Sequence, residues 1–406
     1  MADTADVMRR SLSDRTGFLA PGLRRRMMTA ALGMSDVIAL GRGDPDFETP
    51  AHIVSGALAG IDNGLTHYTP WTGLPRLRQA IAAKIAARNG FTVDPDREVV
   101  VTGGAQEAVF LAMQLLLDPG DQVVVADPHY TAYDTSITLA GGSIVAVPSL
   151  DEPGYVPSID AYREAMTDRS KVLLVINPGN PSGALHSTER LRELADLAIE
   201  RDLAVVADEV YEDFLYGAAP PVSIASLPGM RERTVTIYSL SKTYAMTGWR
   251  IGYLTAPAAF VERAAELHYA ISICASSVAQ GAAIAAMEGT TDHLEDWLEV
   301  LGDRCQALVS GLNAAGIRCE PPSGGFTVLA DIRGTGVDAE TFCRRLLERA
   351  RVQIFPGTMY GQTGEGFVRI SFLAPRESID AAVERISAVI DTIADENAPA
   401  LPLPVA

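Results

Sequence analysis

The sequence predicts an α/β protein, in which a large domain contains a mostly parallel seven-stranded sheet flanked by helices. A smaller α+β domain is expected from the C-terminal part and an N-terminal segment. Three observations support this prediction. Between Glu98 and residue 255, short apolar segments alternate with amphipathic helical segments. The apolar segments are continuous runs of Val, Leu and Ile, which are typical of strands covered on both faces. Beyond Gly316 the order changes to strand, helix, strand, strand, helix.

The elements of the large domain follow from these patterns. Its expected strands are 98–102, 122–126, 143–147, 171–176, 203–207, 234–238 and 250–255. Helices are expected between most of them, at 105–117, 130–140, 158–167 and 187–200. Upstream of the sheet, the pattern predicts a short strand at 37–40 and helices at 51–63 and 75–89, the second beginning with Pro75 in its first turn. Ligands on such sheets bind outside the carboxyl ends of the strands.

The C-terminal part begins with long helices. One is expected over 257–287 and another over 291–315, followed by the smaller domain's elements at 326–331, 337–350, 352–355, 367–372 and 376–394. We therefore expect four segments: 1–45 as an N-terminal arm and small-domain segment, 46–290 as the large ligand-binding domain, 291–396 as the small domain, and 397–406 as an extended tail.

Composition excludes several classes of protein. A chain of 406 residues with 48% hydrophobic side chains can bury a sizeable core, and its net charge of -18 argues against nucleic acid or an anionic membrane as a partner. The four cysteines form no CxxC pair and have no accompanying histidine cluster, so we expect free thiols in a reducing compartment and no metal site. No hydrophobic signal core follows the N-terminus. The sequence predicts a cytoplasmic protein without a membrane partner.

Lys242 lies in a small-residue turn between two β-type runs. A lysine between two buried strands is costly unless its amine has a function. The hydroxyls of Ser239 and Ser241 and the guanidinium of Arg250 lie in the same segment. Together they could gather a dianionic phosphate beside an amine that forms an imine with an aldehyde, which predicts a site for pyridoxal phosphate. Taken alone, Lys242 is more simply an ordinary exposed loop lysine, so the prediction depends on the segments below.

Two Gly-containing loops follow expected strands, one after 98–102 and one after 37–40. Residues 102–108 end a strand and open a helix, where free amides without nearby side chains can bind phosphate. A tight strand-to-helix connection is an equally good interpretation of this segment by itself. The loop from Gly41 to Pro50 would let backbone amides approach a ligand closely, or it is a bare surface turn.

Asp208 comes directly after the apolar strand 203–207, so its carboxylate emerges from the sheet. A buried carboxylate is expensive unless it meets a cation. A pyridinium N–H would be that cation, and the pair would keep the ring electron-withdrawing. Tyr211, three residues later, could reach the 3-oxygen of the ring. The alternative for Asp208 is a helix N-cap.

Further polar and aromatic residues follow neighbouring strands. Two Asn-Pro steps in residues 177–183 make a rigid turn. Within this turn we favour a structural role for Asn177 and a role as amide donor to a ligand for Asn180. The segment 127–133 brings aromatic side chains to the ligand edge, where one could stack on a flat ring, although core packing is an alternative for Tyr133.

Arg369 lies within an apolar strand of the smaller domain. A planar guanidinium flanked by hydrophobic residues favours a bidentate carboxylate. An internal ion pair is the alternative. We favour a substrate carboxylate because the other segments require a carboxylate clamp.

These motifs jointly resemble the fold-type I pyridoxal-phosphate-dependent enzymes of the class I/II aminotransferase family, from about Asp36 to Ile393. The resemblance rests on three motifs in this order: Asn-Pro-Gly-Asn-Pro-Ser-Gly at 177–183, Asp-Glu-Val-Tyr at 208–211, and Ser-Leu-Ser-Lys followed by Gly-Trp-Arg-Ile-Gly at 239–252. It implies pyridoxal 5'-phosphate as the cofactor, bound by the large domain at 46–290. It also implies a homodimer with shared active sites.

The resemblance implies a role for each matching residue. Lys242 would form the imine with the cofactor, and Asp208 would face the pyridine nitrogen. Asn180 and Tyr211 would bind the ring 3-oxygen, and Tyr130 would stack on the ring. Lys242, Asp208 and Tyr211 are thus the expected catalytic residues.

The remaining implied contacts concern the phosphate and the substrate. The residues expected at the phosphate are Gly104, Ala105, Gln106, Ser239 and Arg250. Tyr68 would reach the phosphate of the neighbouring subunit's cofactor. The substrate α-carboxylate would be bound by Arg369, with help from Asn180 and the backbone of Gly41. No basic residue for a side-chain carboxylate is identified by motif.

The expected activity is transfer of an amino group from an L-amino acid to a 2-oxo acid, with Lys242 moving the Cα proton and pyridoxamine phosphate carrying the amino group. A β- or γ-eliminating lyase of the same fold, such as a C–S lyase or an aminocyclopropane-carboxylate-synthase-like enzyme, is an alternative because it shares the lysine. A non-catalytic sensing domain like those of aminotransferase-like transcriptional regulators is disfavoured. The chain is acidic and has no appended basic helix-turn-helix segment.

Overall fold

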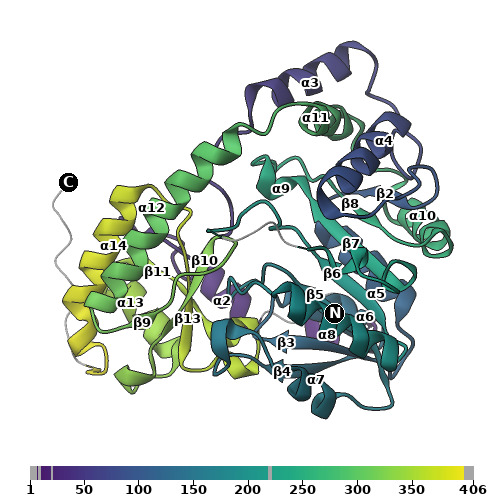
Figure 1. The fold of residues 1–406 in the computed structure, drawn as a ribbon. Coiled ribbons are helices and arrows are strands. Elements are labelled where there is room, and N and C mark those ends of the chain that lie inside the picture. Colours follow the sequence, from purple (N-terminus) through teal and green to yellow (C-terminus); the bar gives the residue numbers. More distant parts are fainter. Residues whose placement is uncertain (1–6, 8–10, 20–21, 218–221, 397–406) are drawn as a thin grey trace.

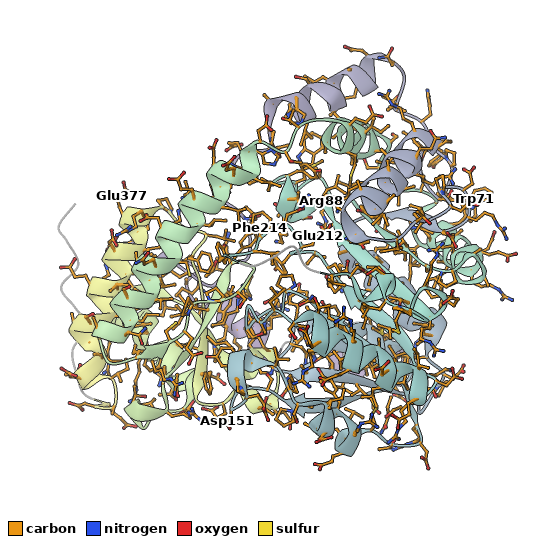
Figure 2. All side chains as sticks on the ribbon, viewed as in Figure 1. Trp71, Arg88, Asp151, Glu212, Phe214 and Glu377 are labelled. Atoms are coloured by element: carbon orange, nitrogen blue, oxygen red, sulfur yellow. The ribbon has the colours of Figure 1, made fainter. Side chains whose placement is uncertain are left out.

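The computed structural model describes residues 7, 11–19, 22–217 and 222–396, so the predicted extended tail at 397–406 lies outside the described residues. Figure 1 shows a seven-stranded sheet with its covering helices beside a smaller four-stranded sheet, and helix α12 (His293–Ala314) extends between the two parts. Phe214, labelled near the centre of Figure 2, lies between the fifth and sixth strands of the large sheet in sequence and packs on Phe326, with ring centroids 4.4 Å apart.

The large sheet has the strand order β2-β8-β7-β6-β5-β3-β4. Its strands are β2 (Val99–Thr102), β3 (Gln122–Asp127), β4 (Ser143–Pro148), β5 (Ser170–Ile176), β6 (Ala204–Asp208), β7 (Thr234–Ser239) and β8 (Gly252–Thr255). All neighbours are parallel except β8, which is antiparallel to β2 and β7. The predicted mostly parallel seven-stranded sheet is confirmed.

Alternate side chains of these strands point to two separate apolar cores. On one face, residues such as Val125 and Leu174 pack with helices α5 (Ala105–Leu116), α6 (Ala132–Leu139) and α10 (Ala258–Ser272). On the other face, residues such as Leu173 and Val205 pack with α7 (Ile159–Ala165) and α8 (Thr188–Glu200). Because both faces are buried, the strands read as continuous apolar runs in the sequence.

A third core covers the β2–β8–β7 end of the large sheet. It is formed with helices α3 (Ala51–Asp62), α4 (Pro75–Lys84) and α11 (Ser277–Glu288). The close approach of α3 to α11 is possible because Gly56 has no side chain, since a Cβ there would lie 2.3 Å from the Ala285 Cβ.

The four-stranded antiparallel sheet has the order β12-β13-β10-β9. Its strands are β9 (Arg318–Cys319), β10 (Thr327–Asp331), β12 (Phe355–Pro356) and β13 (Phe367–Ser371). It shares one apolar core with α12, α13 (Ala339–Ala350) and α14 (Arg376–Val389). The N-terminal segment joins this part, because β1 (Ile38–Ala39) pairs in parallel with β11 (Val352–Gln353). Helix α2 (Leu23–Thr29) precedes β1. The domain boundaries stay a prediction.

The prediction of one long helix over 257–287 was wrong. The chain forms α10 and α11, separated at Ile273, whose φ of 67° is incompatible with a right-handed helix. The side chain of Ser276 accepts a hydrogen bond from Ala279 N at 3.3 Å and caps the start of α11. The capping serine was visible in the sequence, but the apolar periodicity on both sides concealed the break.

Other elements differ from the prediction at their ends. The helix predicted over 75–89 is α4 followed by a π-helical turn at Ile85–Asn89, and the strand predicted over 352–355 is divided between β11 and β12. The helix predicted over 376–394 ends as the 3-10 turn Ile390–Thr392. Further 3-10 turns are Asp14–Leu19, Pro153–Tyr155, Ile224–Ser226, Arg231–Arg233, Arg333–Thr335, Gly357–Tyr360 and Gln362–Gly364. In the part of the chain described, no helix combines the length and apolar character needed to cross a bilayer.

Candidate active site

A cavity of about 720 Å³ lies where the carboxyl ends of the large sheet's parallel strands meet the smaller part of the molecule. Its lining includes most of the residues predicted for the site: Gly41, Ala105, Gln106, Tyr130, Asn180, Asp208, Tyr211, Ser239, Lys242, Arg250 and Arg369. The first and last of these residues, Gly41 and Arg369, are more than three hundred positions apart in the sequence. The fold therefore brings together groups from the carboxyl ends of the large sheet's strands and groups from the smaller part of the molecule.

Lys242 lies on the short helix α9 (Leu240–Thr243), directly after β7. The side chain of Ser239 caps this helix by accepting a hydrogen bond from Ser241 N at 3.1 Å. The Lys242 amine donates a hydrogen bond to the Gly43 carbonyl oxygen. Burial lowers the pKa of Lys242 to about 8, against the opposing effect of Asp44 and with the help of Arg369 and Arg250. Its amine is thus neutral at a much lower pH than that of an ordinary lysine.

A polar cluster contacts α9 at Thr243, the residue after Lys242. Asp213 accepts a hydrogen bond from Thr243 Oγ1 at 2.7 Å and forms an ion pair with Arg88 Nη1 at 2.6 Å. Lys84 forms a neighbouring ion pair with Glu212. Figure 2 labels Arg88 and Glu212 near the middle of the molecule. These contacts fix the position of the turn that carries Lys242.

Asp208 ends β6 and is buried. Its Oδ2 accepts a hydrogen bond from the Tyr133 hydroxyl at 2.5 Å, and its Oδ1 accepts one from Val210 N at 3.1 Å. Burial raises the pKa of Asp208, because no cation among the described residues forms an ion pair with it. The carboxylate therefore lacks the positive partner that would keep it ionised. Tyr133, for which the sequence left core packing open, orients this carboxylate.

Asn180 and Tyr211 meet at the cavity wall. Asn180 Nδ2 donates to the Tyr211 hydroxyl at 3.4 Å, and the buried Asn180 Oδ1 has no hydrogen-bond partner in the described residues. Asn177 instead lies outside the cavity lining, where its Oδ1 accepts from His186 N at 2.9 Å. Asn177 thus makes a structural contact, whereas the role of Asn180 as an amide donor to a ligand stays a prediction.

Arg250 and the start of α5 both line the cavity and offer donors suited to an anion. Gly104, with φ 97°, precedes the helix without a side-chain cap, so the first amides of the helix lack intrahelical partners. Arg250 Nη2 donates to the Gly103 carbonyl oxygen at 3.2 Å. A Cβ on Gly104 would lie 2.5 Å from that same Nη2, so glycine is needed for the guanidinium to approach the helix. Gly104 itself is not part of the cavity lining.

Arg369 is buried in β13, and no ion pair to it is found within the described residues. One Nη donates to the Tyr360 hydroxyl, while the buried Nε has no partner there. The predicted alternative, an internal ion pair, is therefore not what the described residues form. Gly41 lies nearby in the lining, and a Cβ on it would lie 2.8 Å from the Phe355 ring.

Tyr68, like Gly104, is a predicted site residue outside the cavity lining. Its side chain is 78% exposed, and it does not line the cavity of this single chain. Among the charged and tyrosine side chains of the lining, the sequence analysis gave no role to four: Arg24 on α2, Arg42, Asp44, and Tyr360 in the turn before β13. Arg42 and Asp44 lie in the 41–50 loop that the sequence singled out as a possible ligand-binding loop. No local motif marks Arg24 and Tyr360, which reach the cavity through long-range contacts. No cluster of His, Cys, Asp and Glu suited to a metal ion occurs among the described residues.

Comparison with known proteins gives one consistent family. The model of the family "Aminotransferase class I and II" matches residues 35–386. The chain is 37% identical to an aspartate aminotransferase of Pyrococcus abyssi, covering 94% of this chain and 98% of that protein. It is 36% identical to an aromatic-amino-acid aminotransferase of Thermococcus litoralis, with the same coverage. The solved structure of a Thermus thermophilus aspartate aminotransferase with maleate superposes with a TM-score of 0.89 at 36% identity, covering 93% of this chain and 99% of that one.

The first prediction concerns the reactivity of Lys242 in the chain without a cofactor. The sequence contains three lysines, Lys84, Lys171 and Lys242. Burial lowers the pKa of Lys242 to about 8, whereas hydrogen bonding to Asp121 raises the pKa of Lys171. Amines react in their neutral form, so trinitrobenzenesulfonate should label Lys242 with a half-maximal rate near pH 8, well below the midpoint for Lys171. Peptide mapping by mass spectrometry at a series of pH values measures both.

A variant of Arg369 tests the cause of this low pKa, because the charge of Arg369 contributes to lowering the pKa of Lys242. In Arg369→Ala the midpoint of Lys242 labelling should move to higher pH. Equal midpoints for Lys242 and Lys171 would contradict this assignment.

Proposed function

The chain belongs to the class I and II aminotransferase family, and from that premise we propose which of its residues carry the reaction. It is a pyridoxal-phosphate-dependent transaminase, which moves an amino group from an amino acid to a 2-oxo acid. The alternative of an eliminating lyase is not favoured, because relatives at 36–37% identity over nearly the whole chain are named aminotransferases. The observation that carries the assignment of residues is that Lys242, Asp208, Arg250 and Arg369 line one cavity.

The cavity suits pyridoxal phosphate on its own chemistry. Asn180 Oδ1 and Arg369 Nε are buried polar atoms without partners in the described residues. Asp208 needs a cation, which a protonated ring nitrogen provides. The free amides of α5, Ser239 and Arg250 form a donor set for a phosphate dianion. Asp208 and the donors at the start of α5 would each meet a complementary part of this one molecule, whereas Arg369 Nε stays available to the substrate carboxylate.

The cofactor-binding residues divide by the part of the molecule they would hold. Ala105 and Gln106 offer backbone amides to the phosphate, together with Ser239 and Arg250, and Gly104 keeps this corner open. Tyr130 supplies a flat face for the ring. Asn180 and Tyr211 bind the ring 3-oxygen, and the Tyr133 hydroxyl holds the Asp208 carboxylate toward the ring nitrogen.

Bound pyridoxal phosphate supplies an electron sink that stabilises negative charge at the substrate Cα. Lys242 would hold the cofactor through its amine and would move the substrate Cα proton at its Nζ. A pKa of about 8 suits this role, because protonated and neutral amine then coexist near neutral pH. Arg369, with the backbone of Gly41 and the Asn180 amide, holds the α-carboxylate and so fixes which bond faces Lys242.

The second prediction tests Lys242. Lys242→Ala should reduce the rate of amino transfer by at least about 10²–10⁴-fold, because the proton-transferring amine is lost. The measurement is oxo acid formation from L-aspartate or L-phenylalanine with 2-oxoglutarate as acceptor. Lys171→Ala, which removes an exposed lysine in a surface ion pair, is the matched control and should keep full activity.

Two outcomes would oppose the proposal. An active Lys242→Ala variant would refute the role of Lys242. Release of ammonia by the unmodified enzyme, without formation of pyridoxamine phosphate, would favour elimination over transamination.

We further propose that the enzyme works as a homodimer with shared active sites. Large apolar side chains are exposed on α3, on the loop that follows it and near the end of α10: Val54, Leu58, Ile61, Tyr68, Trp71, Tyr269, Ile271 and Ile273. Trp71, at the edge of the view in Figure 2, packs on Tyr269 with ring centroids 5.9 Å apart. A second copy covering this surface would bury these side chains and bring Tyr68 to the other subunit's phosphate.

The third prediction follows from this arrangement. Light scattering should give twice the chain mass of 43.2 kDa. Tyr68→Phe should weaken pyridoxal phosphate binding about tenfold, because a hydrogen bond to a charged phosphate is lost. Tyr269→Phe, an exposed tyrosine of the same surface, is the matched control and should bind the cofactor normally. A monomer in solution, or unchanged affinity in Tyr68→Phe, would contradict the shared site.

Arg24 is our candidate for recognising the substrate side chain. It lines the cavity with Met28, one helical turn further along α2, and its guanidinium carbon lies 5.8 Å from the Tyr130 ring centroid. No ion pair to Arg24 is formed within the described residues. The relatives are named for aspartate and for aromatic amino acids, and one was solved with maleate, a dicarboxylate. A free guanidinium beside an aromatic ring can accept an acidic side chain by charge and an aromatic one by stacking.

The fourth prediction separates these two classes of donor. Arg24→Gln should lower kcat/KM for L-aspartate by about tenfold or more, since a charge-assisted hydrogen bond is lost. The loss for L-phenylalanine should be smaller, because exposed stacking on a cation contributes less. Arg25→Gln, the next residue of α2 and outside the cavity lining, serves as control. An equal loss for both donors would remove Arg24 from side-chain selection.

We also propose a cytoplasmic location. All four cysteines are free thiols: Cys274, Cys305, Cys319 and Cys343. Free buried thiols are typical of a reducing compartment. Recovery of the protein outside the cytoplasmic fraction of its native cell would contradict this location.

A further inference from the structure

Tyr360 is a buried tyrosine at the cavity wall that the roles above do not use. It ends the 3-10 turn Gly357–Tyr360 between β12 and β13, and its side chain is 2% exposed. The guanidinium carbon of Arg369 lies 4.9 Å from its ring centroid, and an Arg369 Nη donates to its hydroxyl oxygen. Tyr360 thus touches the arginine expected to hold the substrate carboxylate.

The backbone around Tyr360 is fixed to the loop that carries Tyr130. The Tyr360 carbonyl oxygen accepts from His129 N at 2.7 Å, and the preceding carbonyl, of Met359, accepts from Thr131 Oγ1 at 3.0 Å. Three residues later, Thr363 N donates to Asp127 Oδ2 at 2.9 Å. These bonds hold the hydroxyl of Tyr360 at a set position relative to the aromatic ring expected to stack on the cofactor.

The direction of the hydrogen bond leaves a proton without an acceptor. Arginine has only donors, so the Tyr360 oxygen must accept from Arg369. The hydroxyl proton therefore points elsewhere, and no acceptor for it occurs among the described residues. Burial raises the pKa of Tyr360, with Arg369 opposing, so the hydroxyl stays protonated near neutral pH. Tyr360 O–H and Arg369 Nε are thus two unused donors at one wall.

We propose that the Tyr360 hydroxyl donates a hydrogen bond directly to the substrate α-carboxylate, beside Arg369. This inference rests on the proposed role of Arg369. A carboxylate has two oxygens with about four lone-pair positions, so it can accept from a guanidinium and a hydroxyl at once. A bond to a charged acceptor is stronger than one between neutral groups.

Tyr360→Phe removes the hydroxyl and keeps the ring. The half-reaction of the holoenzyme with L-phenylalanine, followed by the absorbance of the bound cofactor, should show a second-order rate constant about tenfold or more below that of the unmodified enzyme. Calorimetric titration with 3-phenylpropionate, which has the carboxylate but no amine, should show a similar loss of affinity. Tyr216→Phe is the matched control, because its hydroxyl donates to the Gly325 carbonyl oxygen at 2.9 Å outside the cavity lining. It should change neither quantity.

Two comparisons separate a direct contact from mere positioning of Arg369. In an Arg369→Ala background, Tyr360→Phe should lower the rate constant further, whereas a residue acting only through Arg369 would have no additional effect. With 2-phenylethylamine, which lacks a carboxylate, Tyr360→Phe should react as fast as the unmodified enzyme. A loss of the same size with this amine, or no additional loss in the Arg369→Ala background, would overturn the inference.

The proposed function can fail separately. If Arg369→Ala leaves 3-phenylpropionate binding unchanged, the carboxylate site itself is misassigned. If Arg369→Ala weakens binding and Tyr360→Phe does not, only the role of Tyr360 is wrong. Equal melting temperatures of the Tyr360→Phe, Tyr216→Phe and unmodified holoenzymes exclude a general loss of structure as the cause.

Discussion

The rest of the site depends on one constraint: three ionisable side chains are withdrawn from water without ion-pair partners. They are Lys242, Asp208 and Arg369. None of the three forms an ion pair within the described residues, although each carries or can carry a charge. Such groups are costly to bury. The chain holds them with neutral contacts instead: the Gly43 carbonyl for Lys242, the Tyr133 hydroxyl for Asp208 and the Tyr360 hydroxyl for Arg369. A ligand that supplies the missing charges binds only the folded state and thereby stabilises it.

The sequence was informative where chemistry is local. The seven strands were predicted within about two residues because strands buried on both faces are continuous apolar runs. Lys242, Asp208 and Asn180 could be proposed as site residues because each lies at, or within four residues of, the carboxyl end of such a strand, at the edge where ligands bind. Their identities as a group, and the roles assigned to them, came from the resemblance of three motifs to one family.

The parts that sequence did not reveal depend on tertiary contacts. Tyr360 lies in a turn without a motif, and its position is fixed by hydrogen bonds to residues 129 and 131, more than two hundred positions earlier. Arg24 reaches the cavity because the N-terminal segment pairs with β11, a contact that no periodicity encodes. The break at Ile273 was missed for a related reason, since the helices on both sides have apolar faces that continue the same pattern. The roles of Tyr360 and Arg24 and the helix break at Ile273 all depend on where the residue lies in the fold, which its residue type does not reveal.

The charge of the cavity is opposite to that of the whole molecule. The lining contains five basic side chains, Arg24, Arg42, Lys242, Arg250 and Arg369, against the two carboxylates of Asp44 and Asp208, whereas the chain as a whole has a net charge of -18. Mobile ions in physiological salt screen exposed charges beyond about 8 Å, so an incoming anionic metabolite experiences little of the bulk repulsion until it is at the entrance. There the low-dielectric walls concentrate the local positive potential. The acidic exterior thus discourages encounters with large polyanions, while a small oxo acid that reaches the opening is still drawn inward.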